Sequence, residues 1–248
     1  MRARIVIPLA LIGVFSVGNA YALTNTQAKD LMMAAAHKGN DTDLAKLESA
    51  AKSGDAAAQM WMGRYYWGAK KDDKKAVYWI RSAAAQGNAR AEYRLGHAYM
   101  YGLEGLFNRV KGNYWLEKSA AQGYGWAEIA VGSDYNFGVG VPKDYVKAIY
   151  WYKQAAAHGP LSSERRAEVL LGGIEYSPSH SGPHNAEKEI YWYMEAAAHG
   201  SRNAESNLCW AYYTGRDGVP KDYSKAKYWY EKAVAQGWPA GLLPKAFR

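Results

Sequence analysis

Apolar and polar residues alternate along this chain with the period of an α-helix. One face of the segment 145–158 carries apolar residues three to four positions apart, namely Ala148, Trp151, Ala155 and Ala156. This spacing places their side chains on one side of a helix. Asp144 precedes the segment and is a preferred N-cap, because its carboxylate accepts from free backbone N–H groups. Gly159 follows the segment and can adopt the left-handed conformation that ends a helix. The pattern predicts a helix over residues 145–158.

The same pattern occurs five times. Each copy contains a Tyr-Trp pair, and successive tryptophans are 36, 36, 41 and 37 residues apart, at Trp79, Trp115, Trp151, Trp192 and Trp229. An Asp or Asn stands seven residues before each of them, at Asp72, Asn108, Asp144, Asn185 and Asp222. A glycine stands eight residues after each, at Gly87, Gly123, Gly159, Gly200 and Gly237. Because five copies share one register, we interpret the chain as a tandem repeat.

Another helix is predicted before each of these segments. The stretches 91–99, 127–135 and 204–212 share a stripe of Ala, Leu or Val, a small residue and Tyr. The small residue is mostly glycine, which costs about 1 kcal/mol against alanine inside a helix, so we expect close helix contact there. Cys209 takes this position in the last copy and is interpreted as a small buried apolar residue. A glycine-rich turn such as 138–143 joins the two helices into a hairpin.

These units follow four short patterns in a fixed order. They are Ala…Leu-Gly-x-x-Tyr, then Gly-x-Gly-Val-x-x-Asp-x-x-Lys-Ala, then Trp-Tyr-x-x-Ala-Ala, and finally Gly. The units 127–159 and 204–237 match this order at nearly every position. The fourth unit diverges most, with a different turn and Glu189 at an alanine position. The order resembles the SEL-one-like repeat (SLR), a relative of the tetratricopeptide repeat. This resemblance implies an all-α fold, a right-handed α-solenoid of antiparallel helix hairpins that is typically used to bind proteins. Such hairpins cannot bury their apolar faces alone and must stack.

The chain divides into four segments on this interpretation. They are a signal peptide over 1–22, N-terminal capping helices over 23–55, a solenoid of about five repeats over 56–241, and a C-terminal cap or tail over 242–248.

The first segment has the features of an export signal. Arg2 and Arg4 precede an apolar run over residues 5–17, and Ala20 and Ala22 form an A-x-A cleavage pattern. The run is short for a bilayer-spanning helix, so we expect cleavage after Ala22 and no stable membrane insertion afterwards. A membrane anchor is the alternative. We expect a periplasmic protein, or alternatively a secreted one. Cleavage removes two positive charges, which lowers the formal net charge from +8 to +6.

The amino-acid composition excludes some classes of protein. A single Cys excludes a disulfide scaffold and a cysteine-based zinc finger. The 10 Trp and 21 Tyr against 4 Phe come in part from the repeated Tyr-Trp pair. Basic and acidic residues alternate, as in 70–75, which is typical of a solvated face. The predicted export argues against a nucleic-acid partner.

Histidines offer the only metal candidates that we identify. His180 and His184 lie in the divergent fourth turn, but no Cys or further ligand pair stands near them. His158 and His199 replace a glutamine before the terminal glycine, and a helix C-terminus favours such a residue. We therefore expect no bound metal and no cofactor.

Two short motifs raise an enzymatic alternative. Ser49-x-x-Lys52 and Ser224-x-x-Lys227 match the start of a penicillin-recognising serine site, but no Lys-Thr-Gly or Ser-Asp-Asn companion exists. Some cysteine-rich exported members of the resembled family are associated with β-lactam binding or hydrolysis. This chain lacks their regularly placed cysteines. The alternative function is an enzyme that binds or hydrolyses β-lactams or cell-wall fragments.

The leading hypothesis is a non-catalytic exported protein that binds another protein in the bacterial cell envelope. It includes an adaptor or scaffold, a regulator, and an immunity protein that neutralises a toxin. First helices line the concave face of such solenoids, and Trp and Arg often anchor interfaces. We therefore predict that an exposed groove is formed by Trp61, Arg64, Arg94, His97, Asp134 and Trp210. The alternative is that these residues pack between adjacent repeats.

Overall fold

The computed structural model describes residues 22–38, 40–176, 185–215 and 218–239. Several predictions fall outside these ranges, namely residues 1–21 of the signal peptide, the loop histidines His180 and His184, and the tail 242–248.

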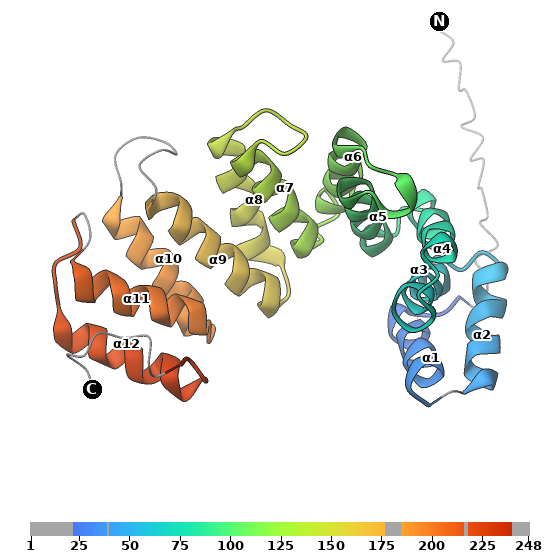
Figure 1. Ribbon diagram of the computed structural model, residues 1–248, viewed down its shortest axis with the longest axis horizontal. Coiled ribbons are helices and arrows are strands. Elements are labelled where there is room, and N and C mark those ends of the chain that lie inside the picture. The colour runs from blue at the N-terminus through green and yellow to red at the C-terminus, as the bar shows by residue number, and fades with distance from the viewer. Residues whose placement is uncertain (1–21, 39, 177–184, 216–217, 240–248) are drawn as a thin grey trace, which may run out of the picture.

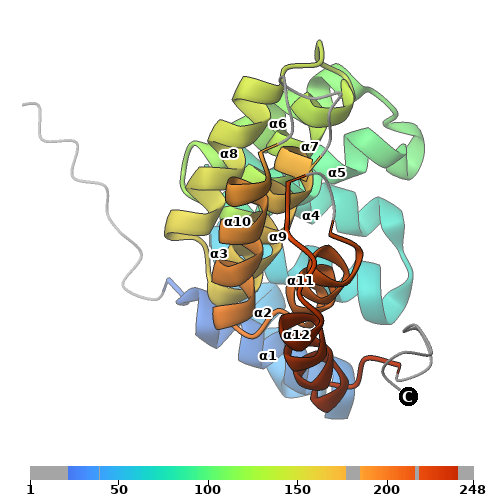
Figure 2. The same ribbon diagram turned by 90° about the vertical axis from the view of Figure 1, so that its left-hand side faces the viewer.

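The helices stack into an arch whose two ends curve toward the same side (Figure 1). The described residues form no strand, which confirms the predicted all-α solenoid of antiparallel hairpins. Five hairpins follow two leading helices, and Figure 2 views the stack from the end that holds α11 and α12. The elements are α1 (Asn25–Lys38), α2 (Asp41–Lys52), α3 (Ala56–Tyr65), η1 (Tyr66–Lys70), α4 (Asp73–Ala85), α5 (Ala89–Tyr101), η2 (Leu103–Gly105), α6 (Arg109–Ala120), α7 (Gly125–Phe137), α8 (Tyr145–His158), α9 (Leu161–Tyr176), α10 (Ala186–Ala198), α11 (Arg202–Thr214) and α12 (Tyr223–Ala235).

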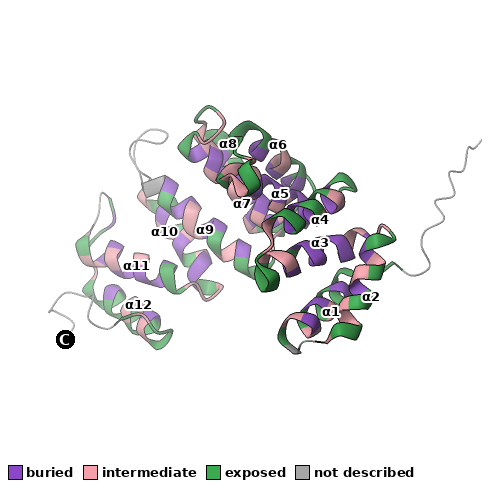
Figure 3. Ribbon diagram, turned by 45° about the vertical axis from the view of Figure 1, so that its right-hand side comes forward, coloured by how far each residue is buried: buried purple, intermediate pink, exposed green. Residues whose placement is uncertain are grey.

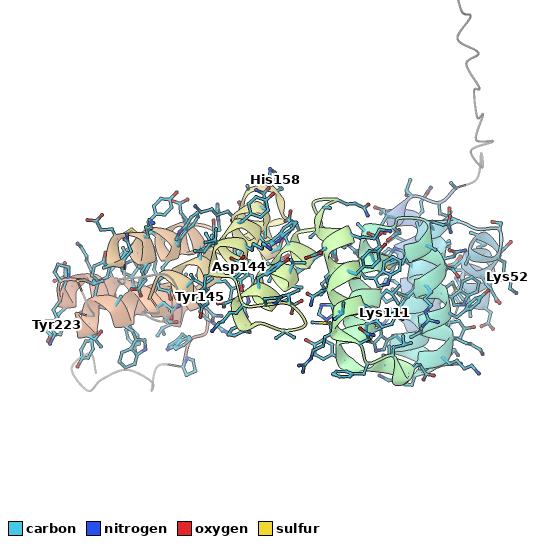
Figure 4. The ribbon with its side chains drawn as sticks, turned by 90° about the horizontal axis from the view of Figure 1, so that it is seen from above. Lys52, Lys111, Asp144, Tyr145, His158 and Tyr223 are labelled. Carbon is cyan, nitrogen blue, oxygen red and sulfur yellow. The ribbon has the colours of Figure 1, made fainter. Side chains whose placement is uncertain are left out.

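The five predicted N-caps are confirmed at the second helix of each hairpin. Asp144 Oδ1 accepts a hydrogen bond of 3.0 Å from the backbone N–H of Lys147, and Figure 4 marks Asp144 and Tyr145 at the start of α8. The equivalent bonds of 2.9–3.0 Å are accepted by Asp72, Asn108, Asn185 and Asp222. Each cap satisfies one of the N–H groups that a helix start leaves free.

A tyrosine at the end of the first helix joins this cap. The backbone N–H of Asp144 donates to the carbonyl of Tyr135 at 2.9 Å, and Lys147 Nζ lies 4.9 Å from the Tyr135 ring centre. A cation over an aromatic face is attracted by the ring quadrupole. The same two contacts recur in three other hairpins at Tyr66, Tyr99 and Tyr212. In these four hairpins the cap therefore holds the start of the second helix against the end of the first.

Close helix contact at the glycine position is also confirmed. A Cβ atom on Gly132 would lie 2.6 Å from the Tyr152 ring, and one on Gly96 would lie 2.7 Å from Leu116. Cys209, at the same position of the last hairpin, is 2% exposed. Burial raises the pKa of its thiol to about 11, so it is an unreactive core residue, as expected.

The helix-ending glycines follow the prediction at four positions and depart from it at one. Gly87, Gly123, Gly200 and Gly237 have φ between +75° and +83°. Gly159 instead has φ −72° and ψ 161°. Its successor is Pro160, and the residue before a proline is held in extended backbone. The chain therefore leaves α8 extended, and α9 starts directly after Pro160.

The core is a row of clusters that bridge neighbouring elements. One of them joins Ala148 and Tyr152 of the third hairpin with Leu171 of the fourth, and Trp192 packs against it. Figure 3 shows the buried residues along the helix faces that meet their neighbours. In the first cluster, Met32 of α1 and Leu47 of α2 pack with Trp61 of α3. The two leading helices therefore cover the apolar end of the stack.

Two adjacent glycines of α9 test the glycine contact. A Cβ on Gly172 would lie 2.5 Å from the Tyr193 ring, whereas one on Gly173 would meet nothing within 4 Å. We expect Gly173→Ala to raise the free energy of unfolding by about 1 kcal/mol through helix propensity. We expect Gly172→Ala to be roughly 1–3 kcal/mol less stable than Gly173→Ala because the core there is already filled. Urea unfolding followed by circular dichroism measures both, and equal stabilities would contradict the predicted contact.

Candidate partner-binding surface

A cavity of about 430 Å³ opens between α1, α3, η1 and α5. Three of these elements, α1, α3 and α5, lie on the inner side of the arch (Figure 1). Apolar and aromatic side chains form most of its wall, and no acidic residue lines it. The lining residues are Met32, Met33, Ala36, His37, Arg64, Tyr65, Trp67, Gly68, Ala69 and Arg94. We call this site the inner cavity.

Arg64 and Arg94 make the inner cavity cationic. The Arg94 guanidinium lies 5.6 Å from the Trp67 ring centre, and its Nε is buried without a hydrogen-bond partner. Burial, and then the charge of Arg64, lower the pKa of Arg94, although an arginine stays protonated in proteins. Two like charges beside an unused donor provide a place for an anionic group. The structure therefore brings these two predicted residues together.

His97 stands three residues after Arg94 on α5 but does not line the inner cavity, and it stays neutral near pH 7. Burial, and then the charge of Arg94, lower the pKa of its imidazole to about 4. The ring lies 4.4 Å from the ring of Tyr93 and stacks on that of Tyr101 at 5.5 Å. Its Nε2 is buried without a hydrogen-bond partner. His97 can therefore donate or accept a hydrogen bond without adding charge.

Trp61 does not form the exposed anchor that we expected. Its side chain is 3% exposed and belongs to the first core cluster. The indole Nε1–H donates to Asn25 Oδ1 of α1 at 2.9 Å, and the Arg90 guanidinium lies 5.2 Å from its ring centre. The leading helices cover this face of α3, so the alternative of packing between neighbours describes Trp61.

Asp134 and Trp210 lie further along the arch, in the third and fifth hairpins. Asp134 is 8% exposed, and burial raises the pKa of its carboxyl to about 7. Trp210 is half-buried, contacts the ring of Tyr213, and borders a cavity of about 10 Å³ that holds at most one water. Neither residue lines the inner cavity.

A second basic cavity of about 380 Å³ lies further along the arch, between α7, α9 and α11. It combines a tryptophan, Trp126, with three arginines, Arg165, Arg166 and Arg202, and again no acid lines it. Arg165 Nη1 donates to the carbonyl of Gly200 at 3.1 Å. Two basic, aromatic hollows are therefore spaced along one molecule.

Sequence reasoning missed Met33, His37 and Trp67, although all three line the inner cavity. Met33 and His37 lie in the predicted capping helices, where no repeat register pointed to an inner face. Trp67 carried a usable signal, because it is one of the tryptophans outside the Tyr-Trp register.

The two Ser-x-x-Lys motifs lack the environment of a catalytic site. Ser49 and Ser224 are exposed. Lys52 Nζ pairs with Glu48 Oε1 at 2.8 Å, and this hydrogen bond raises its pKa. A lysine that acts as a base needs the opposite shift. Figure 4 shows Lys52 at one end of the arch.

A buried polar pair ties the two helices of most hairpins. Gln122 Nε2, after α6, donates to Glu92 Oε2 of α5 at 2.6 Å. Gln86 pairs with Gln59 at 2.8 Å and Gln236 with Glu205 at 2.8 Å. His199 takes the glutamine's place in the fourth hairpin, with Nδ1 3.1 Å from Glu168. The acceptor residues are at most 7% exposed, at Gln59, Glu92, Glu168 and Glu205, so each tie gives a hydrogen bond to a polar atom of a buried side chain.

Comparison with models of protein families identifies the family of this chain. The Sel1 repeat model matches residues 56–88, 89–124, 127–160 and 202–238, which is more than half of the sequence. The chain therefore belongs to the Sel1 repeat family. Proteins of this fold are typically non-catalytic scaffolds that mediate protein–protein interaction. The fourth hairpin is not among the matched segments, although it folds as the others do.

Solved structures support the same assignment. A Sel1 repeat protein from Oxalobacter formigenes is 28% identical, with a TM-score of 0.71 over 85% of this chain and 83% of its own. The protective antigen c5321 of uropathogenic Escherichia coli, which displays an SLR fold, is 27% identical, with a TM-score of 0.69 over 87% of this chain. This chain spans 47% of that antigen. A structure from Klebsiella pneumoniae subsp. pneumoniae, 23% identical over 77% of this chain and 92% of its own with a TM-score of 0.52, shows the fold alone.

Comparison with curated proteins finds no match. Within the described ranges, no helix is both long and apolar enough to cross a membrane.

Asp134 makes stability depend on pH. Its pKa rises from 3.8 to about 7 on folding, so the native state binds the proton more tightly and stability falls as pH rises between these values. We expect Asp134→Asn to remove this fall and to raise the free energy of unfolding at about pH 8 by roughly 2 kcal/mol or more. Urea unfolding at about pH 5 and pH 8 measures both effects. Asp30→Asn, at an exposed position on α1, is the matched control. Equal pH slopes for wild type and Asp134→Asn would contradict the prediction.

Proposed function

We propose that this chain is a non-catalytic exported protein that binds another protein in the bacterial cell envelope through the inner side of its arch. The observation that carries the proposal is the inner cavity, where Arg64 and Arg94 face an apolar wall that no acid lines. An acidic partner segment with a neighbouring apolar side chain complements such a site. Charged groups give the orientation and rate of encounter, and the apolar wall gives buried contact.

Export is supported by the residue at the expected cleavage site. The backbone N–H of Leu23 donates to Asp55 Oδ2 at 2.7 Å, and Asp55 is 8% exposed. Asp55 also caps α3 through Ala58. Cleavage after Ala22 would convert the Leu23 amide into an α-ammonium group beside this carboxylate. A charge-assisted hydrogen bond is roughly twice as strong as a neutral one, so this start suits the mature fold.

Adaptor, regulator and toxin-neutralising immunity protein all fit this mode of binding, since a groove can cover a partner's surface without chemistry of its own. The enzymatic alternative is less favoured, because Lys52 is held by Glu48 with a raised pKa. Turnover of a chromogenic β-lactam by the purified protein, lost on Ser49→Ala or Ser224→Ala, would favour the enzyme instead.

Charge reversal tests the inner cavity. The partner is first identified by affinity capture from periplasmic extract with mass spectrometry, and is then purified. We expect Arg64→Glu/Arg94→Glu to weaken its binding roughly 10-fold or more, because two charged hydrogen bonds are replaced by repulsion. Arg64→Gln/Arg94→Gln should give a smaller loss in the same direction.

The matched control is Arg81→Glu/Lys153→Glu, which changes the charge equally at exposed positions of the second helices α4 and α8. Circular dichroism checks that all variants keep their helix content. Unchanged binding by the Arg64 and Arg94 variants, or an equal loss in the control, would remove the cavity from the proposed interface.

The export proposal predicts the mature N-terminus. Protein recovered from the periplasm of a Gram-negative host should begin at Leu23, as measured by intact mass and N-terminal sequencing. Ala22→Arg should retain the precursor at full mass, because signal peptidase needs a small residue there. Recovery of the uncleaved wild-type chain in the cytosol would contradict export.

A further inference from the structure

The fourth hairpin, α9 and α10, carries three changes around one buried carboxylate, and it shares one of them, a histidine in place of glutamine, with the third hairpin. Glu168 corresponds to Glu92 and Glu205, which are tied by Gln122 and Gln236. Here the glutamine is replaced by His199. The other two departures are Glu195 and Glu164, and all three bring metal-ligating side chains to the same place.

Glu195 reverses a charge that other hairpins supply. It stands three residues after Trp192, where the second and fifth hairpins have Lys118 and Lys232. Lys118 Nζ lies 3.5 Å from Glu92 Oε1. Burial raises the pKa of Glu205, and the charge of Lys232 opposes this rise. Glu195 instead places a carboxylate at this position. The fourth hairpin therefore has a carboxylate where the second and fifth hairpins have a lysine.

Glu164 lies on the same face of α9 as Glu168 because α9 begins one turn earlier than the first helices of the other hairpins. The equivalent position elsewhere is the N-cap of the first helix, occupied by Asp55, Asn88, Tyr124 or Ser201. Pro160 lets α9 start at Leu161. Glu164 then lies inside the helix, four residues before Glu168, and residues four apart share one helix face.

The three side chains converge closely. His199 Nδ1 lies 3.1 Å from Glu168 Oε2, and His199 Nε2 lies 4.0 Å from Glu164 Oε1. One ligand atom from each of the three residues can be chosen so that all lie within 4.8 Å of one another. Ligands of a tetrahedral ion with bonds of about 2.0–2.2 Å stand roughly 3.3 Å apart, so side-chain rotations that bring both carboxylates to one imidazole nitrogen would close the site.

Charges around the site are unbalanced toward the negative. Glu164 and Glu168 each have a carboxylate oxygen within 4.0 Å of an imidazole nitrogen of His199, and Glu195 stands four residues before His199. Arg165 is the adjacent cation on α9, and its Nη1 donates to the carbonyl of Gly200. Glu168 is 4% exposed, and a buried charge needs a partner. A protonated His199 supplies one positive charge against three carboxylates.

We propose that Glu164, Glu168 and His199 bind a divalent transition-metal ion of the Zn²⁺ class between α9 and the end of α10. An imidazole with two carboxylates is a ligand set that suits zinc, and three protein ligands leave a coordination position for water or a partner's side chain. Glu195 adds negative charge beside the ion. The bound ion supplies the positive charge that Lys118 and Lys232 supply in the second and fifth hairpins.

Isothermal titration of the tag-free mature protein with ZnCl₂ at about pH 8, where imidazole is deprotonated, tests the site. We expect one equivalent to bind. His199→Gln should weaken binding roughly 100-fold or more, and Glu164→Gln roughly 10-fold or more. Glu195→Lys should weaken it through restored charge compensation. His199→Gln keeps the fold testable, because glutamine makes this tie in three other hairpins.

Two control variants separate this site from His158 and from the two loop histidines. His158→Gln changes the neighbouring hairpin, where Tyr124 stands in place of Glu164, and His180→Ala/His184→Ala changes the divergent loop. Both should bind Zn²⁺ like wild type. Zn²⁺ should raise the melting temperature of wild type and both controls but not of His199→Gln. Absence of binding to wild type, unchanged binding to His199→Gln, or an equal loss in either control would overturn the proposal.

Discussion

Close contact between the two helices of each hairpin is the constraint on which the rest of the arch depends. Only a small residue fits at the glycine position of the first helix. A bulky residue of the second helix, such as Leu116 or Tyr152, already fills the space beside it. Protein interiors tolerate little change in volume, so this contact sets the distance between the helices. The polar ties and the tyrosine contacts form only because the helices are held at that distance. Each hairpin then offers the next one a similar apolar face, and the stack grows from nearest-neighbour contacts.

The residues that differ between the hairpins and form candidate sites lie outside this helix contact. Arg64 and Arg94 lie outside the helix contact, and a basic cavity can form there without disturbing the repeat. The fourth hairpin goes further, since Pro160, Glu164, Glu195 and His199 change its polar centre while Gly172 and Tyr193 keep the contact. The hairpin that the family model leaves unmatched therefore keeps the architecture and changes the chemistry. In such a scaffold the residues that stabilise the fold are separate from the residues that form candidate binding sites.

Much of the fold followed from local rules that need no knowledge of distant contacts. Asp144, its helix and the glycine position of α7 could be predicted because capping and close packing act within a few residues or within one repeat. The predicted left-handed conformation of Gly159 was wrong for an equally local reason. The following proline holds Gly159 in extended backbone, and a comparison between repeats conceals this effect. The candidate surface could be predicted only in part. Arg64 and Arg94 were found by their register, whereas Met33 and His37 come from helices that carry no repeat.

The sequence by itself determined the period, the hairpin, most of the helix ends and the family, because each depends on residues that are close along the chain. Tertiary structure decided exposure. Trp61 has the register of a surface residue, yet α1 covers it, and its indole bonds to Asn25, 36 residues away. The same holds for the cluster of Glu164, Glu168 and His199, where the nearest members come from α9 and the end of α10, 31 residues apart. Burial and charge depend on which neighbours a side chain meets, and in a stacked repeat the neighbouring element supplies them.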